Sequence, residues 1–407
     1  MASRYGGPLH GKPADPLLAF RRKREKIERG IDVRTEPDRW RIGISGSYGG
    51  MNLGDEAILE AMLTELRAAV PAHVTVFSRN PRDTLATHRV ERAVDVRAMT
   101  RREIAPEIEA LDLFVLGGGG ILYDYDAETY LREVFIAHEK GVPVFVYGIS
   151  AGPLDTIAAR RAVREALNDC AVITVRDRQG LRLLEDAGVT REILLTADPA
   201  LLLQPEPLPA ATLRAEGVEL ERPLVGFSVR EPGPAAPHID PVDYHAMLAH
   251  AADFVVERLD AHVVFVPMER MDVQHSHAVV ASMRNPEQAE ILRRRHSPRQ
   301  ILDFVARLQF AVGMRLHFLI FAALQGTPFT ALPYASKVTG LLEDLDMEMP
   351  PLGTVGTGQL IARIDRSWDR REEISARIRS KVPAMQERAR RTNELLVSLL
   401  TQQRVSA

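Results

Sequence analysis

The sequence is poor in the residues that mark several common classes of protein. It has one cysteine among 407 residues, Cys170, which excludes a disulfide framework and a CxxC metal site. Such sparing use of cysteine suits a reducing cytoplasm. No apolar run approaches the roughly 20 residues that span a bilayer, and the N-terminus lacks the apolar core of a secretory signal. We therefore expect a cytoplasmic protein without a transmembrane segment, with the inner face of the membrane as an alternative place of action.

A strong net charge is also missing. The formal net charge of -3 argues against a protein that coats nucleic acid, so any basic site must be local. The densest basic patch, FRRKREK, lies within residues 1–39, which we expect to form a flexible basic arm. Two interpretations stay open: a solvated, frayed terminus, or a peripheral contact with an acidic membrane surface or partner.

Short apolar runs that alternate with helix-period segments are abundant. The predicted strands are 41–46, 73–78, 112–118, 142–148, 170–175, 192–198, 224–231, 262–268, 310–315 and 328–334. Helical patterns stand between them, most clearly at 55–70, 244–259 and 298–308. Strands that alternate with helices predict βαβ units and parallel sheets.

The length of the chain favours more than one domain. A Pro-rich stretch, 201–223, interrupts the alternation and is typical of a linker. We therefore predict an α/β fold with two Rossmann-like, doubly wound domains that face each other across a cleft. The predicted parts are the arm, domains at 40–204 and 224–364, a linker at 205–223, and a charged helical tail at 365–407.

In open parallel sheets, ligands bind beyond the carboxyl ends of the strands. The first such junction reads GSYGGMNLGDEAIL (46–59), a glycine-rich loop that enters a helix and could bind an anion. Its spacing departs from both GxGxxG and the P-loop. Asn52, Asp55 and Glu56 are candidates for the acceptor side of a site, but helix capping explains the two carboxylates equally simply.

The second junction, LGGGGILYD (116–124), has more glycines than a turn requires. We interpret it as a loop that lines a site, with Gly118 and Gly119 as candidates for binding a donor substrate. The third junction is VREPG, where Arg230 is either a solvated strand end or a ligand in the cleft.

The fourth junction reads VGMRLHFLIFAALQG (312–326) and places Arg315 and His317 at the start of an apolar run. An unpaired buried arginine costs roughly several kcal/mol, so an anionic partner is expected. If the segment is extended, residues two apart share one face and both side chains point into the cleft. The alternative for His317 is a histidine buried in the core with its hydrogen bonds satisfied.

A further strand end lies just beyond, in LPYASKVTGLL (332–342), and adds Tyr334 and Lys337. These cations predict a ligand with more than one negative group.

With these junctions in view, the chain resembles the polysaccharide pyruvyl transferases. The resemblance runs in order from about residue 41 to 347. The matching motifs are GSYGGMNLGDEAIL, VLGGGGILYD, VYGISAGPL, VRDRQGLRLLEDAGV, ADPALLL, SVRE, GMRLHFLIFAALQGTPF and PYASKVTGLLEDL. It implies a fold similar to the GT-B glycosyltransferases and transfer of a pyruvyl group from phosphoenolpyruvate to a sugar as a ketal.

The resemblance also implies roles for particular residues. Arg315 and His317 match donor-binding and catalytic positions, Arg230 matches a position for the same donor, and Lys337 is a weaker match. Asn52, Asp55 and Glu56 match the acidic first loop, with Tyr334 as a further acceptor-side candidate. We expect no metal and no cofactor besides phosphoenolpyruvate as co-substrate, and a saccharide acceptor that could be lipid-linked. Two alternatives remain: a GT-B glycosyltransferase that uses a nucleotide-sugar, and a non-catalytic protein that binds anions or sugars.

Overall fold

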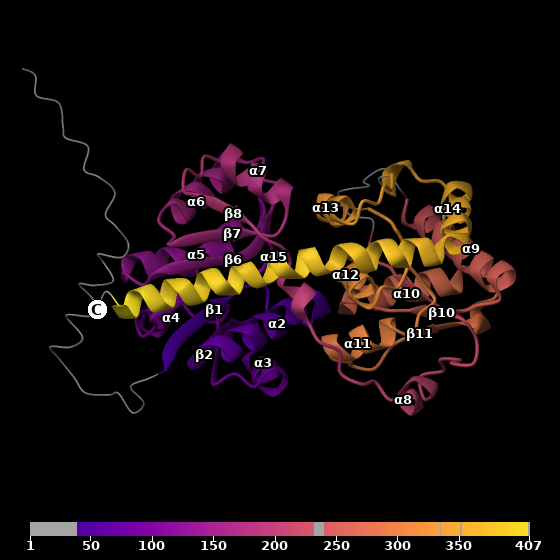
Figure 1. Ribbon diagram of the computed structural model, residues 1–407, viewed down its shortest axis with the longest axis horizontal. Helices are drawn as coiled ribbons and strands as arrows, with labels where there is room; N and C mark the ends of the chain where they lie inside the picture. Colours follow the sequence, from indigo (N-terminus) through magenta and orange to yellow (C-terminus); the bar gives the residue numbers. More distant parts are fainter. Residues whose placement is uncertain (1–38, 232–239, 334, 351, 406–407) are drawn as a thin grey trace, which may run out of the picture.

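A computed structural model describes residues 39–231, 240–333, 335–350 and 352–405 (Figure 1). Residues 1–38 of the predicted basic arm and the candidate Tyr334 lie outside the described residues. The described chain forms two α/β domains, each built on a parallel sheet, as the alternation of strands and helices predicts.

The N-terminal domain contains an eight-stranded sheet with the strand order β3-β2-β1-β4-β6-β7-β8, and β5 pairs with β6. Its strands are β1 (Trp40–Ser45), β2 (Ala72–Ser78), β3 (Arg92–Asp95), β4 (Leu113–Leu116), β5 (Gly119–Leu122), β6 (Val144–Ala151), β7 (Val172–Val175) and β8 (Ile193–Leu195). Its helices are α2 (Leu53–Ala69), α3 (Pro81–His88), α4 (Arg101–Glu109), α5 (Ala127–Glu139), α6 (Ile157–Asn168) and α7 (Arg178–Asp186), followed by the short 3₁₀ helix η1 (Pro199–Leu202). The strands β4 and β6 are buried throughout, which is why they appear in the sequence as continuous apolar runs.

The C-terminal domain contains a five-stranded sheet with the order β11-β10-β9-β12-β13. Its strands are β9 (Leu224–Ser228), β10 (His262–Phe265), β11 (Ala289–Ile291), β12 (Phe310–Gly313) and β13 (Phe329–Ala331). The helices are α8 (Ala210–Arg214), α9 (Pro241–Leu259), α10 (Arg270–Ala281), α11 (Pro298–Val305), α12 (Leu316–Gln325), α13 (Ser336–Asp344), α14 (Thr357–Asp369) and α15 (Arg371–Val405), with the 3₁₀ helices η2 (Pro286–Gln288) and η3 (Leu352–Thr354). The predicted linker therefore contains one short helix, and the predicted boundary at residue 364 lies inside α14.

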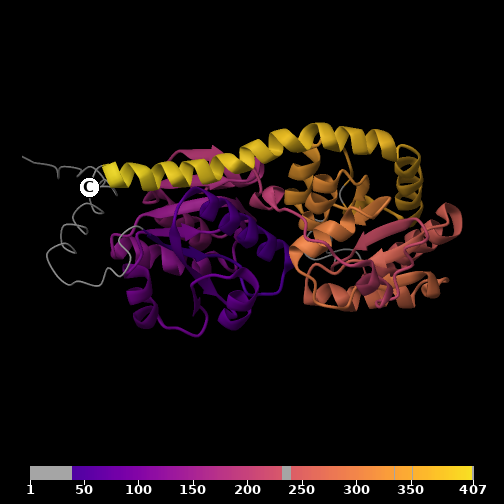
Figure 2. The ribbon, with the colours of Figure 1, turned by 60° about the horizontal axis from the view of Figure 1, so that its bottom comes forward.

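The long helix α15 runs along both domains in two views (Figures 1 and 2). Arg388 pairs with Asp344 of α13 at 2.7 Å, and the Asn393 side chain donates a hydrogen bond to the Glu65 carbonyl of α2. Among the described residues, no helix combines the length and the apolar character needed to cross a membrane.

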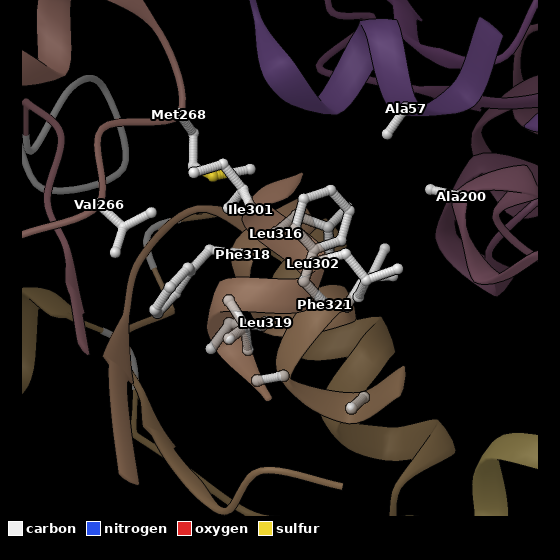
Figure 3. Close-up of a cluster of buried hydrophobic side chains, with 14 of the residues drawn as sticks. Ala57, Ala200, Val266, Met268, Ile301, Leu302, Leu316, Phe318, Leu319 and Phe321 are labelled. Atoms are coloured by element: carbon white, nitrogen blue, oxygen red, sulfur yellow. The ribbon is translucent and has the colours of Figure 1, made fainter. Parts of the chain in front are cut away.

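One apolar cluster continues across the boundary between the domains. Figure 3 shows Ala57 of α2 and Ala200 of η1 facing Leu316 and Leu302 of the C-terminal domain. The backbone N–H of Leu53 also donates to the carbonyl of Met268 across the same boundary, at 2.7 Å. The two domains therefore meet through packed side chains as well as through the chain connection.

Candidate active site

A cavity of about 290 Å³ lies where the carboxyl ends of strands from both sheets meet. The N-terminal domain contributes residues that follow β1, β2 and β7, together with residues in and after β5. The C-terminal domain contributes residues that follow β10, β12 and β13. The lining residues are Ser47, Gly50, Asn52, Asp55, Arg79, Gly120, Tyr123, Asp126, Tyr130, Arg176, Met268, Glu269, Arg315, Leu316, His317 and Lys337.

His317 lies in the first turn of α12, not in an extended segment as the sequence suggested. Arg315 is the N-cap of this helix, and its carbonyl accepts from the Leu319 N–H at 3.2 Å. The predicted i, i+2 geometry is therefore wrong, yet both side chains line the same cavity because the first helical turn opens into it. The helix ends at Gln325, and its C-cap Gly326 has the left-handed conformation that favours glycine.

The imidazole of His317 faces a carboxylate of the opposite domain. Its Nε2 lies 3.5 Å from the Oδ2 of Asp198, and this buried nitrogen has no hydrogen-bond partner among the described residues. The same carboxylate oxygen accepts a hydrogen bond of 2.6 Å from Arg176. Burial raises the pKa of Asp198, but Arg176 and then His317 outweigh burial and hold the pKa below its usual range. Asp198 therefore stays ionised beside His317.

The other side of the imidazole packs against the start of α2. A Cβ added to Gly54 would lie 2.0 Å from the Nδ1 of His317, so only glycine leaves room for the ring. Asp55 follows in the same helical turn and lines the cavity. Burial raises the pKa of Asp55, with opposing effects of His317, Ser47 and Lys337. A carboxyl with a raised pKa beside a histidine is suited to proton transfer.

Arg315 is buried, with 8% of its surface exposed, and it is engaged by two carboxylates of the C-terminal domain. Its Nε donates to Asp272 at 3.0 Å, and its terminal nitrogen binds both Asp272 and Glu269. Burial raises the pKa of Asp272, although Arg315 lowers it. The Asn52 amide donates to Glu269 at 3.1 Å, which ties the first glycine-rich loop to this cluster. The anionic partner that we expected for Arg315 is therefore provided by Asp272 and Glu269 of the protein itself.

Arg230 lies near this cluster but does not line the cavity. It pairs with the neighbouring Glu231, and Tyr244 donates a hydrogen bond to the Arg230 carbonyl. Burial raises the pKa of Glu231, but Arg230 and, more weakly, Arg315 outweigh it. Among the described residues, Glu231, Glu269 and Asp272 bring carboxylate oxygens within 4.8 Å of one another. Since Arg315 and Arg230 bind these three carboxylates, two guanidinium groups already offset most of their negative charge.

Glu56 does not face the cavity. Its carboxylate accepts a hydrogen bond from the Gly49 N–H at 2.9 Å and contacts the Nε2 of His88 at 2.7 Å.

Gly118 and Gly119 also lie outside the lining of the cavity, whereas Gly120 lines it. The predicted glycine loop is partly a strand, since Gly119 and Gly120 belong to β5. Gly119 has a positive φ of 108°, a backbone conformation that favours glycine, and it lies beside the Asp55 carboxylate.

Several lining residues were not among the candidates chosen from the sequence. Arg79 follows β2 and donates hydrogen bonds of 2.5 Å to the Ser47 and Tyr130 hydroxyls. Arg176 follows β7 in the same way. Each residue directly follows a predicted strand, Arg79 after 73–78 and Arg176 after 170–175. A search for charged residues at strand ends, which selected Arg230, could therefore have found them. Glu269 directly follows the predicted strand 262–268 and could have been found in the same way, whereas Tyr123, Asp126 and Tyr130 carry no comparable signal.

The charges that line the cavity are mixed rather than uniformly positive. The arginines 79, 176 and 315 and Lys337 face it together with His317, but so do Asp55, Asp126 and Glu269. Such a lining can bind an anion through the cations while the carboxylates accept hydrogen bonds from hydroxyl groups or exchange protons.

Comparisons with known proteins show which family the chain is similar to. A family model described as polysaccharide pyruvyl transferase matches residues 52–336. The amylovoran biosynthesis protein AmsJ of Erwinia amylovora is 20% identical over 299 residues, which cover 68% of this chain and 70% of AmsJ.

Solved structures with a similar fold include two UDP-GlcNAc 2-epimerases. The enzyme from Neisseria meningitidis, bound to UDP-GlcNAc, has a TM-score of 0.59 and 10% identity, over 89% of this chain and 99% of its own. The enzyme from Methanocaldococcus jannaschii has a TM-score of 0.59 and 8% identity, over 80% of this chain and 91% of its own. At these identities the likeness shows the fold alone, and it confirms the predicted two-domain, GT-B-like architecture.

Proposed function

Because the chain belongs to the polysaccharide pyruvyl transferase family, we propose that it transfers the pyruvyl group of phosphoenolpyruvate onto a sugar of a polysaccharide or its precursor. The family assigns a pyruvyl transferase role in polysaccharide biosynthesis. In the proposed reaction the pyruvyl carbon forms a ketal across two sugar hydroxyls and phosphate is released. The reaction as written needs no metal ion and no further cofactor.

The observation that carries this proposal is the meeting of His317 with fixed cations from both domains in one cavity. Phosphoenolpyruvate carries a carboxylate and a phosphate on a three-carbon unit, and it therefore needs several cations held at fixed positions. Arg79 and Arg176 of the N-terminal domain face Arg315 and Lys337 of the C-terminal domain. Since Arg315 is already bound to Asp272 and Glu269, we assign the larger share of donor binding to Arg79 and Lys337.

The proton transfers follow from the surroundings of His317. In the protonated form His317 gives its proton to the methylene carbon of phosphoenolpyruvate, which leaves an oxocarbenium-like centre at the neighbouring carbon. A sugar hydroxyl attacks that carbon and passes its proton to Asp55, which lies beside His317. The bond from the same carbon to the phosphate oxygen then breaks, and Asp55 gives its proton to the departing phosphate. The second hydroxyl attacks the same carbon to close the ketal and passes its proton to His317, which restores the acid. The Asp198 carboxylate stabilises the charged imidazole before the transfer.

Binding of phosphoenolpyruvate separates this proposal from its two alternatives. A ligand that binds only the native state raises the melting temperature, so phosphoenolpyruvate should stabilise the protein. Stabilisation by UDP-sugars without any by phosphoenolpyruvate would favour a nucleotide-sugar glycosyltransferase. Phosphate release with a panel of galactosides or mannosides then distinguishes an enzyme from a binding protein.

The variant His317→Ala tests the catalytic assignment. Phosphate release should be abolished, while the affinity for phosphoenolpyruvate stays within about tenfold because the cations remain. The exposed His277 provides the matched control, since His277→Ala removes a histidine on the surface of α10. Full activity in His317→Ala would refute the mechanism without affecting the fold.

A further inference from the structure

A second and larger cavity, of about 340 Å³, lies between α7 of the N-terminal domain and α13 of the C-terminal domain. Figure 1 shows these helices facing each other across the domain boundary, and they are in contact. We call this cavity the α7–α13 cleft. Its lining residues are Arg176, Asp177, Arg178, Gln179, Arg182, Leu195, Thr196, Thr339, Gly340, Glu343, Asp344 and Arg388.

The wall formed by α7 presents two cations that have no ion pair with the described residues. Arg178 and Arg182 stand one helical turn apart, on one face of the helix, and both line the cleft. Within the described part of the chain, neither has a carboxylate within 4 Å. At the inner end, the Arg176 Nε and the Asp177 Oδ2 are buried and form an ion pair with each other at 3.8 Å, but neither atom has a hydrogen-bond partner among the described residues. Their hydrogen-bonding capacity is unused, which favours a polar ligand beside them.

The wall formed by α13 has the opposite character. Thr339, Glu343 and Asp344 line it, and Asp344 also pairs with Arg388 at 2.7 Å. Carboxylates and a threonine hydroxyl accept hydrogen bonds from hydroxyl groups, whereas the arginines opposite suit an oxyanion. The cleft therefore matches a ligand that carries both hydroxyls and a negative group.

The α7–α13 cleft adjoins the candidate active site. Arg176 lines both cavities. A narrow cavity of about 30 Å³ lies between them and shares Lys337 with the active site and Gly340 with the cleft. A ligand in the cleft thus lies next to the residues that surround His317.

We propose that the α7–α13 cleft binds the saccharide acceptor and that Arg178 and Arg182 bind an oxyanion on that saccharide. The oxyanion is the carboxylate of a uronic acid or the phosphate of a diphosphate linkage, because each can present two oxygens to a guanidinium fork. This inference rests on the proposed function and adds the chemical class of the acceptor. An anionic group held in the cleft would direct a neighbouring sugar hydroxyl toward the donor.

Calorimetric titration with two probes, digalacturonate and inorganic pyrophosphate, tests the proposal and distinguishes the two sources of the oxyanion. At least one probe should bind the wild-type protein at millimolar concentration. The double variant Arg178→Ala/Arg182→Ala should lose at least about tenfold in affinity for that probe. The matched control is Arg102→Ala/Arg258→Ala, which removes two exposed arginines outside the cleft and should bind as the wild type does.

Competition with phosphoenolpyruvate locates the bound probe. The affinity for phosphoenolpyruvate should be unchanged when the probe saturates the protein, and it should be unchanged in Arg178→Ala/Arg182→Ala. Failure of both probes to bind, equal affinity in the double variant, or displacement of phosphoenolpyruvate by the probe would each overturn the proposal. If phosphoenolpyruvate itself fails to bind while a probe behaves as expected, the proposed function fails and the cleft remains an anion site.

Discussion

At the scale of single residues, Gly54 of the N-terminal domain packs against the imidazole of His317 from the C-terminal domain. An imidazole from the C-terminal domain occupies the space that any other side chain at position 54 would fill. Asp198 faces the opposite side of the same ring. The position of His317 therefore depends on two residues of the N-terminal domain, and small changes at either residue should lower kcat.

Substitution of Gly54 tests this arrangement most directly. In Gly54→Ala the new methyl group would meet the imidazole, so His317 must move, and kcat for phosphate release should fall by at least about tenfold. Gly358→Ala is the control, because a Cβ there meets nothing within 4 Å. It should leave activity intact and raise the free energy of unfolding by up to about 1 kcal/mol. Equal kcat in both variants would contradict the assigned role of Gly54.

Asp198 provides a second test at this scale. In Asp198→Asn the carboxylate charge beside His317 and Arg176 is lost without a change in size. We expect kcat to fall by about tenfold to a hundredfold and the free energy of unfolding to fall by up to about 3 kcal/mol, because buried Arg176 loses its nearest countercharge and keeps only Asp177 at 3.8 Å. The exposed Asp155→Asn is the control. Normal kcat in Asp198→Asn would show that the carboxylate does not position or charge the imidazole.

The sequence allows the candidate residues to be found but not their partners. Arg315, His317 and Lys337 follow predicted strands, and they line the cavity because parallel strands place their carboxyl ends at one edge. Nothing in the sequence shows that Arg315 is bound by Asp272 and Glu269, since both lie more than forty residues away along the chain. Pairings of this kind depend on the packing of α10 against the start of α12.

At the scale of elements, the start of α2 is supported by a buried ionic cluster. His88, at the end of α3, is 3% exposed and contacts Glu56 at 2.7 Å and Glu60 at 3.1 Å. Burial lowers the pKa of His88, but hydrogen bonds with Glu56 and Glu60 outweigh burial and raise the pKa to about 9. The other oxygen of Glu56 holds Gly49, so the charged histidine fixes α2 and the glycine-rich loop relative to α3.

This cluster makes stability depend on pH. The pKa of His88 in the folded state lies above its ordinary value of 6.5, so the stabilisation is complete below about pH 6.5 and is lost as the pH rises through about 9. The loss should approach roughly 3 kcal/mol in the free energy of unfolding. Urea unfolding from pH 6 to 10 measures it, and His88→Gln should lack this decline. A decline of the same size in the variant would exclude His88 as its source.

The elements differ in how well the sequence predicts them. The buried parallel strands and the helices α2 and α9 appear as clear patterns, because burial on both faces or on one stripe selects the residues. The short strands β3, β5 and β11 were missed. β3 has two charged residues among four and begins with exposed Arg92, and β5 contains Gly119 and Gly120, so neither shows an apolar run. Pairing with a neighbouring strand, rather than local preference, makes these segments extended.

At the scale of the whole molecule, the two domains share one apolar cluster, and α15 crosses between them. The helix begins at the C-terminal domain, where Ser375 donates to the Gly326 carbonyl at 2.6 Å. It then reaches the N-terminal domain, where Asn393 contacts α2. The sequence shows a charged, helix-period tail, but which surfaces it covers depends on the folded arrangement of both domains.

Because α15 connects the two domains, weakening its far end should uncouple them. Leu400 is fully buried, so Leu400→Ser should cost about 2–5 kcal/mol of unfolding free energy. Calorimetry should show one unfolding transition for the wild type and a second, earlier transition for the N-terminal domain in the variant. Phosphoenolpyruvate should then stabilise the variant less, since its proposed cations come from both domains. The exposed Gln402→Ser should behave as the wild type does. A single transition with undiminished stabilisation by phosphoenolpyruvate in Leu400→Ser would show that the domain interface alone, without the end of α15, holds the cavity together.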